Sequence, residues 1–130
     1  MIVGIGVDLV EVGRIERAVR RYGARFVGRV FTDREADYCR AGPRPEERFA
    51  TRFAAKEAAL KALGVGWSQG VRFLEAEISN NELGAPAVTF SGRALELSRE
   101  LGVERVHVSM THHRDFAIAQ VVLEGREDSG

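Results

Sequence analysis

Lysine is almost absent from this chain, although basic residues are common. Of nineteen basic side chains, only Lys56 and Lys61 are lysines, and all the others are arginines. Nineteen acidic side chains balance them, so the formal net charge is +0. A chain without excess positive charge lacks the overall electrostatic signal of a nucleic-acid-binding protein. The two lysines are also close together, five residues apart in the sequence.

Cysteine and long apolar runs are also scarce. The single Cys39 cannot form an internal disulfide, and we interpret it as a structural thiol. The longest apolar runs, near residues 1–10 and 116–123, are far shorter than the ~20 residues that cross a bilayer. The N-terminus has no basic patch followed by a long apolar stretch, as a secretory signal would have. We therefore expect a cytoplasmic protein with no membrane partner.

The composition is typical of one globular domain. The residues are 45% hydrophobic and 29% charged, which provides enough apolar side chains for a core. A chain of 130 residues is too short to form two domains. No repeat, linker or low-complexity segment interrupts it. We expect residues 1–124 to form the domain and residues 125–130 to form a flexible tail.

Apolar spacing and turn residues predict an α+β fold. The pattern predicts helices over residues 12–22, 32–38, 45–63 and 93–101, and strands over residues 1–10, 73–78, 87–90, 105–111 and 116–123. The last two strands flank the polar residues 112–115, as in a hairpin. Strands and helices do not alternate regularly, which argues against a doubly wound parallel sheet.

The first strand has two different faces. Val3, Ile5, Val7 and Leu9 share one, while the other carries two glycines beside Asp8. Taken alone, Asp8 is also suited to cap or turn the chain before the next helix.

The helix predicted over residues 45–63 carries both lysines. Lys56 lies within its apolar stripe, where it either extends its amine to water or is held by a carboxylate or phosphate. Glu57 and Lys61 are one turn apart, as in an ordinary surface ion pair. The carboxylates of Asp8 and Glu57 would suit a hard divalent cation that holds a pyrophosphate, and a lysine amine would balance the remaining negative charge. The sequence alone does not show that they meet.

A basic segment lies near the N-terminus. Residues 14–29 contain six arginines and only Glu16 as an acid, a net charge of +5, and Arg14, Arg17 and Arg21 share the outer side of the first helix. Three interpretations remain open: a solvated face, a docking surface for an acidic protein, or a non-enzymatic nucleic-acid-binding helix.

Two motifs resemble the signatures of the bacterial holo-acyl-carrier-protein synthases. They are Gly4-Ile5-Gly6-Val7-Asp8-Leu9-Val10-Glu11 and Arg52-Phe53-Ala54-Ala55-Lys56-Glu57-Ala58, the second followed by Lys61-Ala62-Leu63-Gly64. The turn at residues 81–86 and the segments 109–112 and 116–121 are similar to the C-terminal half of that family. The resemblance covers nearly the whole chain, and it implies the 4′-phosphopantetheinyl transferase fold for residues 1–124, with a small, mostly antiparallel sheet packed on a long central helix.

The resemblance implies an activity as well. The enzyme would transfer 4′-phosphopantetheine from coenzyme A to a serine of apo-acyl carrier protein, with adenosine 3′,5′-bisphosphate as the second product, in support of fatty acid biosynthesis. Mg²⁺ would be the cofactor, held by Asp8 and Glu57. Glu57, directly or through a water, is the candidate base, and Lys61 would contact phosphate or the reacting serine. The three together form the expected catalytic set, while Lys56 would support the carboxylates.

The remaining expectations concern binding. The resemblance assigns coenzyme A to Lys61, His112, Gly64 and Pro86, although His112 taken alone suits an ordinary polar loop residue. It also implies an acidic acyl carrier protein docked on Arg14, Arg17 and Arg21, and a homotrimer whose active sites are shared between neighbouring subunits. We expect no nucleic-acid partner. A trimeric structural subunit that has lost catalysis is a further alternative, against which the joint presence of Asp8, Glu57 and Lys61 argues.

Overall fold

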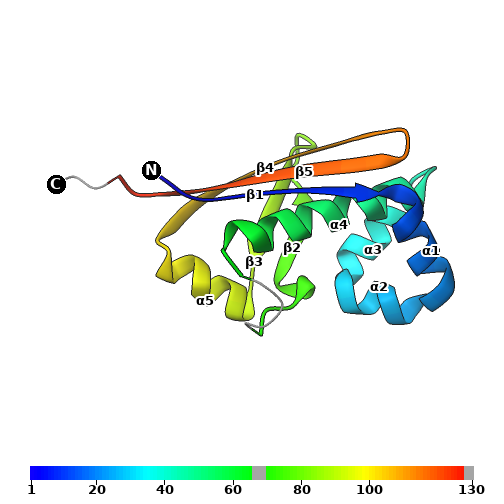
Figure 1. The fold of residues 1–130 in the computed structure, drawn as a ribbon, viewed down its shortest axis with the longest axis horizontal. Helices are drawn as coiled ribbons and strands as arrows, with labels where there is room; N and C mark the ends of the chain where they lie inside the picture. The colour runs from blue at the N-terminus through cyan, green and yellow to red at the C-terminus, as the bar shows by residue number, and fades with distance from the viewer. Residues whose placement is uncertain (66–69, 128–130) are drawn as a thin grey trace.

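The computed structural model describes residues 1–65 and 70–127. Two antiparallel sheets sit on either side of one long helix, α4 (Pro45–Ala62) (Figure 1). The larger sheet has the order β1-β5-β4, formed by β1 (Ile2–Glu11), β5 (Phe116–Gly125) and β4 (Val103–His113). The smaller sheet pairs β2 (Ala76–Asn80) with β3 (Pro86–Phe90). The predicted α+β class is therefore confirmed.

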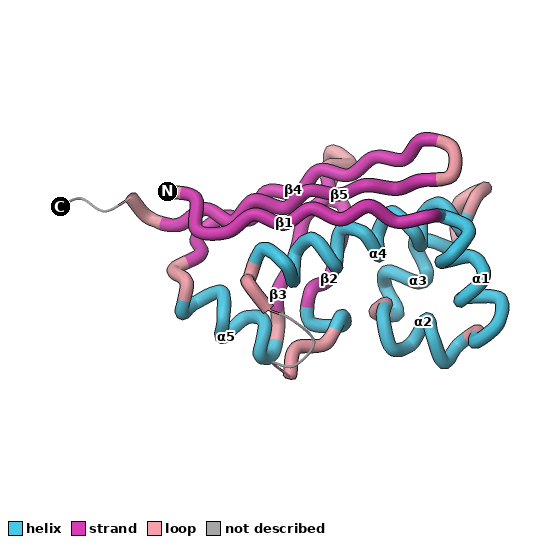
Figure 2. Tube along the Cα trace, viewed as in Figure 1, coloured by secondary structure: helices cyan, strands magenta, loops and turns pink. Residues whose placement is uncertain are grey.

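The shorter helices gather at the two ends of this layer. α1 (Val12–Tyr22), α2 (Ala24–Val30) and α3 (Asp33–Arg40) cluster at one end, and α5 (Gly92–Glu100) lies at the other (Figure 2). Thr32 begins α3 with the predicted capping box, since its hydroxyl accepts from the Glu35 N–H and the Glu35 carboxylate accepts from the Thr32 N–H. Pro45 lies in the first turn of α4, where its missing N–H costs nothing.

Several boundaries differ from the sequence-based expectation. α2 was not predicted, because seven residues that include Gly28 give only a weak helical pattern. The strand expected at residues 73–78 begins as a 3₁₀ turn (Phe73–Glu75) and becomes extended only in β2. β5 continues through Gly125, whose N–H donates to the Met1 carbonyl. The predicted tail starts one residue inside this strand, and residues 128–130 lie outside the described residues.

The two strands β5 and β1 of the large sheet bury different kinds of face. On β5, Ala117, Ala119, Val121 and Leu123 point toward α4 and are at most 1% exposed. On β1, it is the glycine-bearing face that packs on α4, so Ile5, Val7 and Leu9 point away and are more than half exposed. No described element covers this outer face (Figure 1). An apolar sheet face of this size on a single chain indicates an interaction surface.

α4 is buried almost all round. Its buried positions are mostly alanines rather than the large residues of the predicted stripe, and they include Arg52 and the fully buried Lys56. Small side chains let both sheets approach the helix closely. Among the described residues, no helix is long and apolar enough to span a membrane.

Candidate active site

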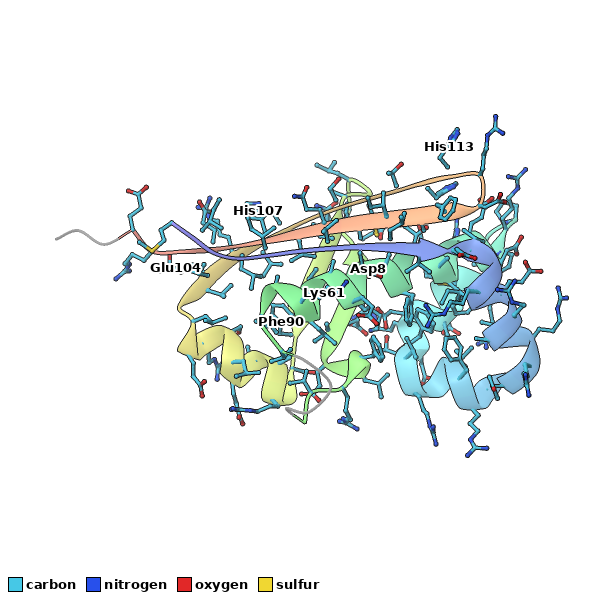
Figure 3. All side chains as sticks on the ribbon, viewed as in Figure 1. Asp8, Lys61, Phe90, Glu104, His107 and His113 are labelled. Carbon is cyan, nitrogen blue, oxygen red and sulfur yellow. The ribbon has the colours of Figure 1, made fainter. Side chains whose placement is uncertain are left out.

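Asp8 and Lys61 meet at the β1 flank of α4. The Nζ of Lys61 donates to Asp8 Oδ1 at 2.8 Å and to the Val7 carbonyl at 3.3 Å. The Asp8 side chain is 15% exposed and that of Lys61 is 49% exposed, so the pair lies at the surface within reach of a ligand (Figure 3). The sequence alone did not show whether Asp8 and Lys61 meet, and the structure brings the two side chains into contact.

Glycines explain why β1 and α4 come so close. A Cβ placed on Gly6 would collide with the Ala58 carbonyl oxygen, and one placed on Gly4 would collide with that of Ala62. Only a strand without side chains on this face can lie directly on the helix backbone. The glycines therefore let Asp8, two residues after Gly6, reach Lys61.

Glu57 belongs to the same group of charges. Burial raises the pKa of its carboxyl, and the negative charge of Asp8 raises it further, while Lys61 and Arg14 act in the opposite direction. The Lys61 pKa is raised, chiefly by its hydrogen bond to Asp8. Two carboxylates from separate elements thus face one region, with one amine and the first arginine of α1 beside them.

This region can hold a divalent cation. Mg²⁺ typically binds one or two protein carboxylates and completes its shell with water and substrate phosphates. Among the described residues, no group of three or more histidine, cysteine, aspartate or glutamate side chains is arranged around a metal position. The donor set of Asp8 and Glu57 therefore fits an open, substrate-completed Mg²⁺ site and not a closed protein cage.

Lys56 does not support these carboxylates, contrary to the expectation from sequence. Its Nζ donates to Glu35 Oε1 and to the Ala76 carbonyl, each at 2.8 Å. Both side chains of this pair have no exposed surface. The interpretation in which a carboxylate holds the lysine is correct, but the carboxylate comes from α3.

A second group of polar residues lines a pocket at the β4 flank of α4. The pocket has a volume of about 290 Å³, and its wall contains Tyr38, Arg44, Arg48, Thr51, Arg52 and His112. The Tyr38 ring lies against two guanidinium groups. Its centroid is 3.9 Å from the Cζ atom of Arg52 and 4.3 Å from the Cζ atom of Arg48. His112 Nδ1 lies 3.8 Å from Glu47 Oε2.

The sequence reasoning missed most of this pocket. It selected His112 but not Tyr38, Arg44, Arg48 or Arg52, because arginines on a helix usually indicate a solvated face. The available signal was the spacing of the three arginines, Arg44, Arg48 and Arg52, which recur every four residues at the start of one helix.

The two groups occupy opposite edges of one sheet. β1 and β4 are its edge strands, and β5 lies between them, so the two flanks are about 10 Å apart across the sheet. His112 therefore does not join Asp8, Glu57 and Lys61 within one chain.

Gly64 lies just after the end of α4, where it has a positive φ of 76° and its N–H donates to the Lys61 carbonyl. Pro86 begins β3, opposite Asn80, and no described contact links it to Asp8.

The arginines of α1 form an exposed face beside the first group. Arg14, Arg17, Arg20 and Arg21 line a shallow, open hollow with Ala18 and Tyr22. Arg14 also lowers the pKa of Glu57 through its charge. The basic face is thus continuous with the carboxylate site. His107 and His113, which we did not assign to any site, lie exposed on β4.

Cys39 is fully buried and has no disulfide partner. Burial raises the pKa of its thiol to about 11. The thiol is therefore protonated at neutral pH, as a structural cysteine should be.

Comparison with known proteins gives a consistent result. Residues 4–121 match the family model of the 4′-phosphopantetheinyl transferase superfamily. The holo-[acyl-carrier-protein] synthase of Koribacter versatilis is 44% identical over 124 residues, which are 95% of this chain and 99% of that protein. The chain is similar to the crystal structure of the Neisseria meningitidis holo-[acyl-carrier-protein] synthase, with a TM-score of 0.85 and 39% identity over 95% of this chain and 99% of that one. It is also similar to the Helicobacter pylori synthase in complex with coenzyme A, with a TM-score of 0.81 and 34% identity over 92% and 99% of the two chains.

Proposed function

The chain belongs to the 4′-phosphopantetheinyl transferase superfamily, and from this membership we propose that its β1 flank catalyses a magnesium-dependent transfer of 4′-phosphopantetheine. The donor is coenzyme A, the acceptor is a serine of apo-acyl carrier protein, and adenosine 3′,5′-bisphosphate leaves. The predicted family and transfer activity are confirmed by the similarity of this chain to holo-[acyl-carrier-protein] synthases. The observation that carries the assignment to these residues is the 2.8 Å contact between Lys61 and Asp8, with Glu57 beside it.

The carboxylates would hold the cation. Asp8 and Glu57 supply hard oxygen donors, and their mutual repulsion, which adds to the effect of burial in raising the pKa of Glu57, would be relieved by a bound cation. When bound, Mg²⁺ would neutralise charge on the pyrophosphate of coenzyme A. Asp8 and Glu57 would therefore align the pyrophosphate, which is the main requirement of phosphoryl transfer.

Glu57 and Lys61 would then act on the reacting groups. The serine hydroxyl forms a bond to the β-phosphorus of coenzyme A while the bond from that phosphorus to the bridging oxygen breaks. Glu57 would accept the serine proton, a role favoured by its raised pKa. Lys61, whose raised pKa keeps its ammonium charged, would stabilise the phosphate oxygens.

The arginine pocket would bind the phosphate-rich end of coenzyme A. Three guanidinium groups supply positive charge and the Tyr38 ring supplies an aromatic surface, which suit phosphates and a nucleotide base. His112 would contribute here, while Gly64 and Pro86 would line the path of the coenzyme near Lys61.

A homotrimer would bring the two flanks together. In a closed ring, the β1 edge of one subunit faces the β4 edge of the next, because each contact joins different surfaces of the chain. The exposed apolar face of β1, with Ile5, Val7 and Leu9, supplies a hydrophobic interface for such a ring. Each active site would then contain Asp8, Glu57 and Lys61 of one subunit and the arginine pocket of its neighbour.

The acyl carrier protein would dock on the basic face of α1. Arg14, Arg17 and Arg21 are exposed and lie next to Glu57, so an acidic partner held there would present its serine to the carboxylate site. We place this reaction in fatty acid biosynthesis in the cytoplasm, and we assign it to one domain over residues 1–124.

One experiment tests the proposed site. Apo-acyl carrier protein, coenzyme A and Mg²⁺ are incubated with the wild type, Asp8→Ala or Glu57→Gln, and the carrier is weighed by mass spectrometry. We expect the wild type to add the phosphopantetheine mass and both variants to be at least about 100-fold slower, because each loses a charge needed in the transition state. Circular dichroism checks that both variants are folded. Near wild-type turnover of either variant at low Mg²⁺ would remove the metal assignment.

A further inference from the structure

The free edge of β2 is completed by side chains. Among the described residues β2 pairs with β3 alone, and its other edge faces α3 and α4. Three backbone groups on that edge are bound by charged side chains: the Ala76 carbonyl by Lys56, the Ile78 N–H by Glu35, and the Ile78 carbonyl by Arg52. All three side chains are at most 2% exposed. They replace the neighbouring strand that this edge lacks.

Glu35 connects three elements at once. Its Oε1 accepts from Lys56 Nζ and from the Thr32 N–H, and its Oε2 accepts from the Ile78 N–H, all at 2.8 Å. It therefore joins the start of α3 to α4 and to β2. A buried ion pair adds little net stability compared with a well-packed apolar pair. An apolar pair, however, would leave the backbone groups of β2 without partners.

The same network reaches the wall of the arginine pocket. Ile78 binds Glu35 through its N–H and Arg52 through its carbonyl, the latter at 3.1 Å. Arg52 lies one turn before Lys56 on α4, and Tyr38 lies one turn after Glu35 on α3. Arg52 and Tyr38 contact each other at 3.9 Å and both line the pocket. A shift of β2 would therefore move the Arg52 guanidinium relative to the Tyr38 ring.

We propose that Glu35 and Lys56 are positioning residues for coenzyme A binding. They hold the free edge of β2 in register, which fixes Arg52 and Tyr38 as one wall of the arginine pocket. Neither residue contacts the coenzyme itself. This inference rests on the proposed function, in which the pocket receives the phosphates of coenzyme A.

The test is a double variant, Glu35→Gln with Lys56→Met. It removes both charges of the ion pair together and leaves an amide that can still bind the β2 edge in part, so neither Glu35 nor Lys56 leaves a buried charge without its partner. We expect the variant to fold, with the Michaelis constant for coenzyme A raised about 10-fold or more by the displaced wall. The turnover number and the Michaelis constant for the carrier should change less than about 3-fold. Calorimetric titration with coenzyme A alone should show the same loss of affinity.

Two controls separate the possible failures. Leu123→Ala leaves a cavity in β5, far from the β2 edge, and it should lower stability without changing the affinity for coenzyme A. Arg48→Gln removes a pocket arginine that does not bind β2. If Arg48→Gln keeps full affinity, the pocket is not the coenzyme site and the proposed function is wrong there. If Arg48→Gln weakens binding and the folded double variant does not, the positioning role is wrong.

A second variant covers the case in which the double variant does not fold. Asn80 is exposed, and its Oδ1 accepts from Arg52 Nη2 at 2.9 Å, so Asn80→Ala loosens the same guanidinium without touching the buried pair. We expect its affinity for coenzyme A to fall about 3-fold, because the lost bond holds the guanidinium in place and does not itself contact the coenzyme, while the Ile78 carbonyl still binds Arg52. Unchanged affinity would show that the position of Arg52 does not matter and would overturn the proposal.

Discussion

Lys56 and Lys61 form the same bond in opposite surroundings. Each amine lies 2.8 Å from a carboxylate, and the two residues are little more than one turn apart on α4. The Lys56 side chain has no exposed surface, and desolvation lowers its pKa, whereas Lys61 is half exposed, and its bond to Asp8 raises its pKa. The N–O distance of an ion pair therefore does not distinguish a pair that is buried in the fold from one that a ligand can reach. The exposure of the two side chains to solvent makes that distinction.

The largest expected effect follows from the buried pair. Lys56→Met alone leaves the Glu35 carboxylate buried without its partner amine, which should lower the free energy of unfolding by about 3–5 kcal/mol. Lys61→Met breaks a pair that solvent already screens, and it should cost less than about 1 kcal/mol. Urea denaturation of both variants measures the difference. Equal losses would show that burial does not distinguish the two lysines.

The second prediction concerns the exposed pair and has two parts. Lys61→Met should lower kcat/KM for transfer about 100-fold, because it removes the charge that we propose stabilises the reacting phosphate. The same variant should bind a divalent cation about 3- to 5-fold more tightly in the absence of coenzyme A, because the amine no longer occupies Asp8 Oδ1. Mn²⁺ titration followed by electron paramagnetic resonance measures the cation affinity directly.

Arg14→Gln is the matched control for that measurement. Arg14 acts on Glu57 through its charge but forms no described bond with Asp8. If Arg14→Gln improves cation affinity as much as Lys61→Met does, the effect is one of overall charge and not of competition for Asp8. Weaker cation binding in Lys61→Met would contradict the prediction outright.

The difference between the two lysines was only partly predictable from the sequence. Lys61, Glu57 and Asp8 belong to motifs that are local in the chain, so the resemblance could predict a joint role for them. The partner of Lys56 was not predictable, because Glu35 is 21 residues away in another helix. Periodicity placed Lys56 on the buried side of a helix, but it gave no position for α3.

The same limit explains the large sheet and the pocket. Alternation in β1 identified a glycine face and an apolar face, but it did not say which of them a helix would cover. The contact of Gly4 and Gly6 with the α4 backbone decides it, because it leaves the apolar face exposed. The arginine pocket draws on α3, α4 and β4, and no single segment of sequence contains it.

The smallest expected effect concerns Glu57. Its pKa is raised in the folded protein, so its contribution to stability is fully present below its unfolded pKa and is lost as pH rises through the raised value. Glu57→Gln does not titrate, and without Mg²⁺ it should melt about 2 °C above the wild type at neutral pH. The advantage should vanish at acid pH, where Glu57 is protonated. Thermal melts across pH measure it, and a variant that is less stable at neutral pH would contradict the sign.

The contact between β1 and the α4 backbone also limits how this protein can change over generations. At Gly4 and Gly6, any other residue would collide with a main-chain oxygen, and main-chain atoms cannot be exchanged by mutation. A substitution at either glycine would therefore have to move the strand that carries Asp8 away from the helix that carries Glu57. A mutant library that seeks new substrates would gain little from these positions. Its useful diversity lies in the arginines of α1 and in Arg44 of the pocket, where side chains are exposed to solvent.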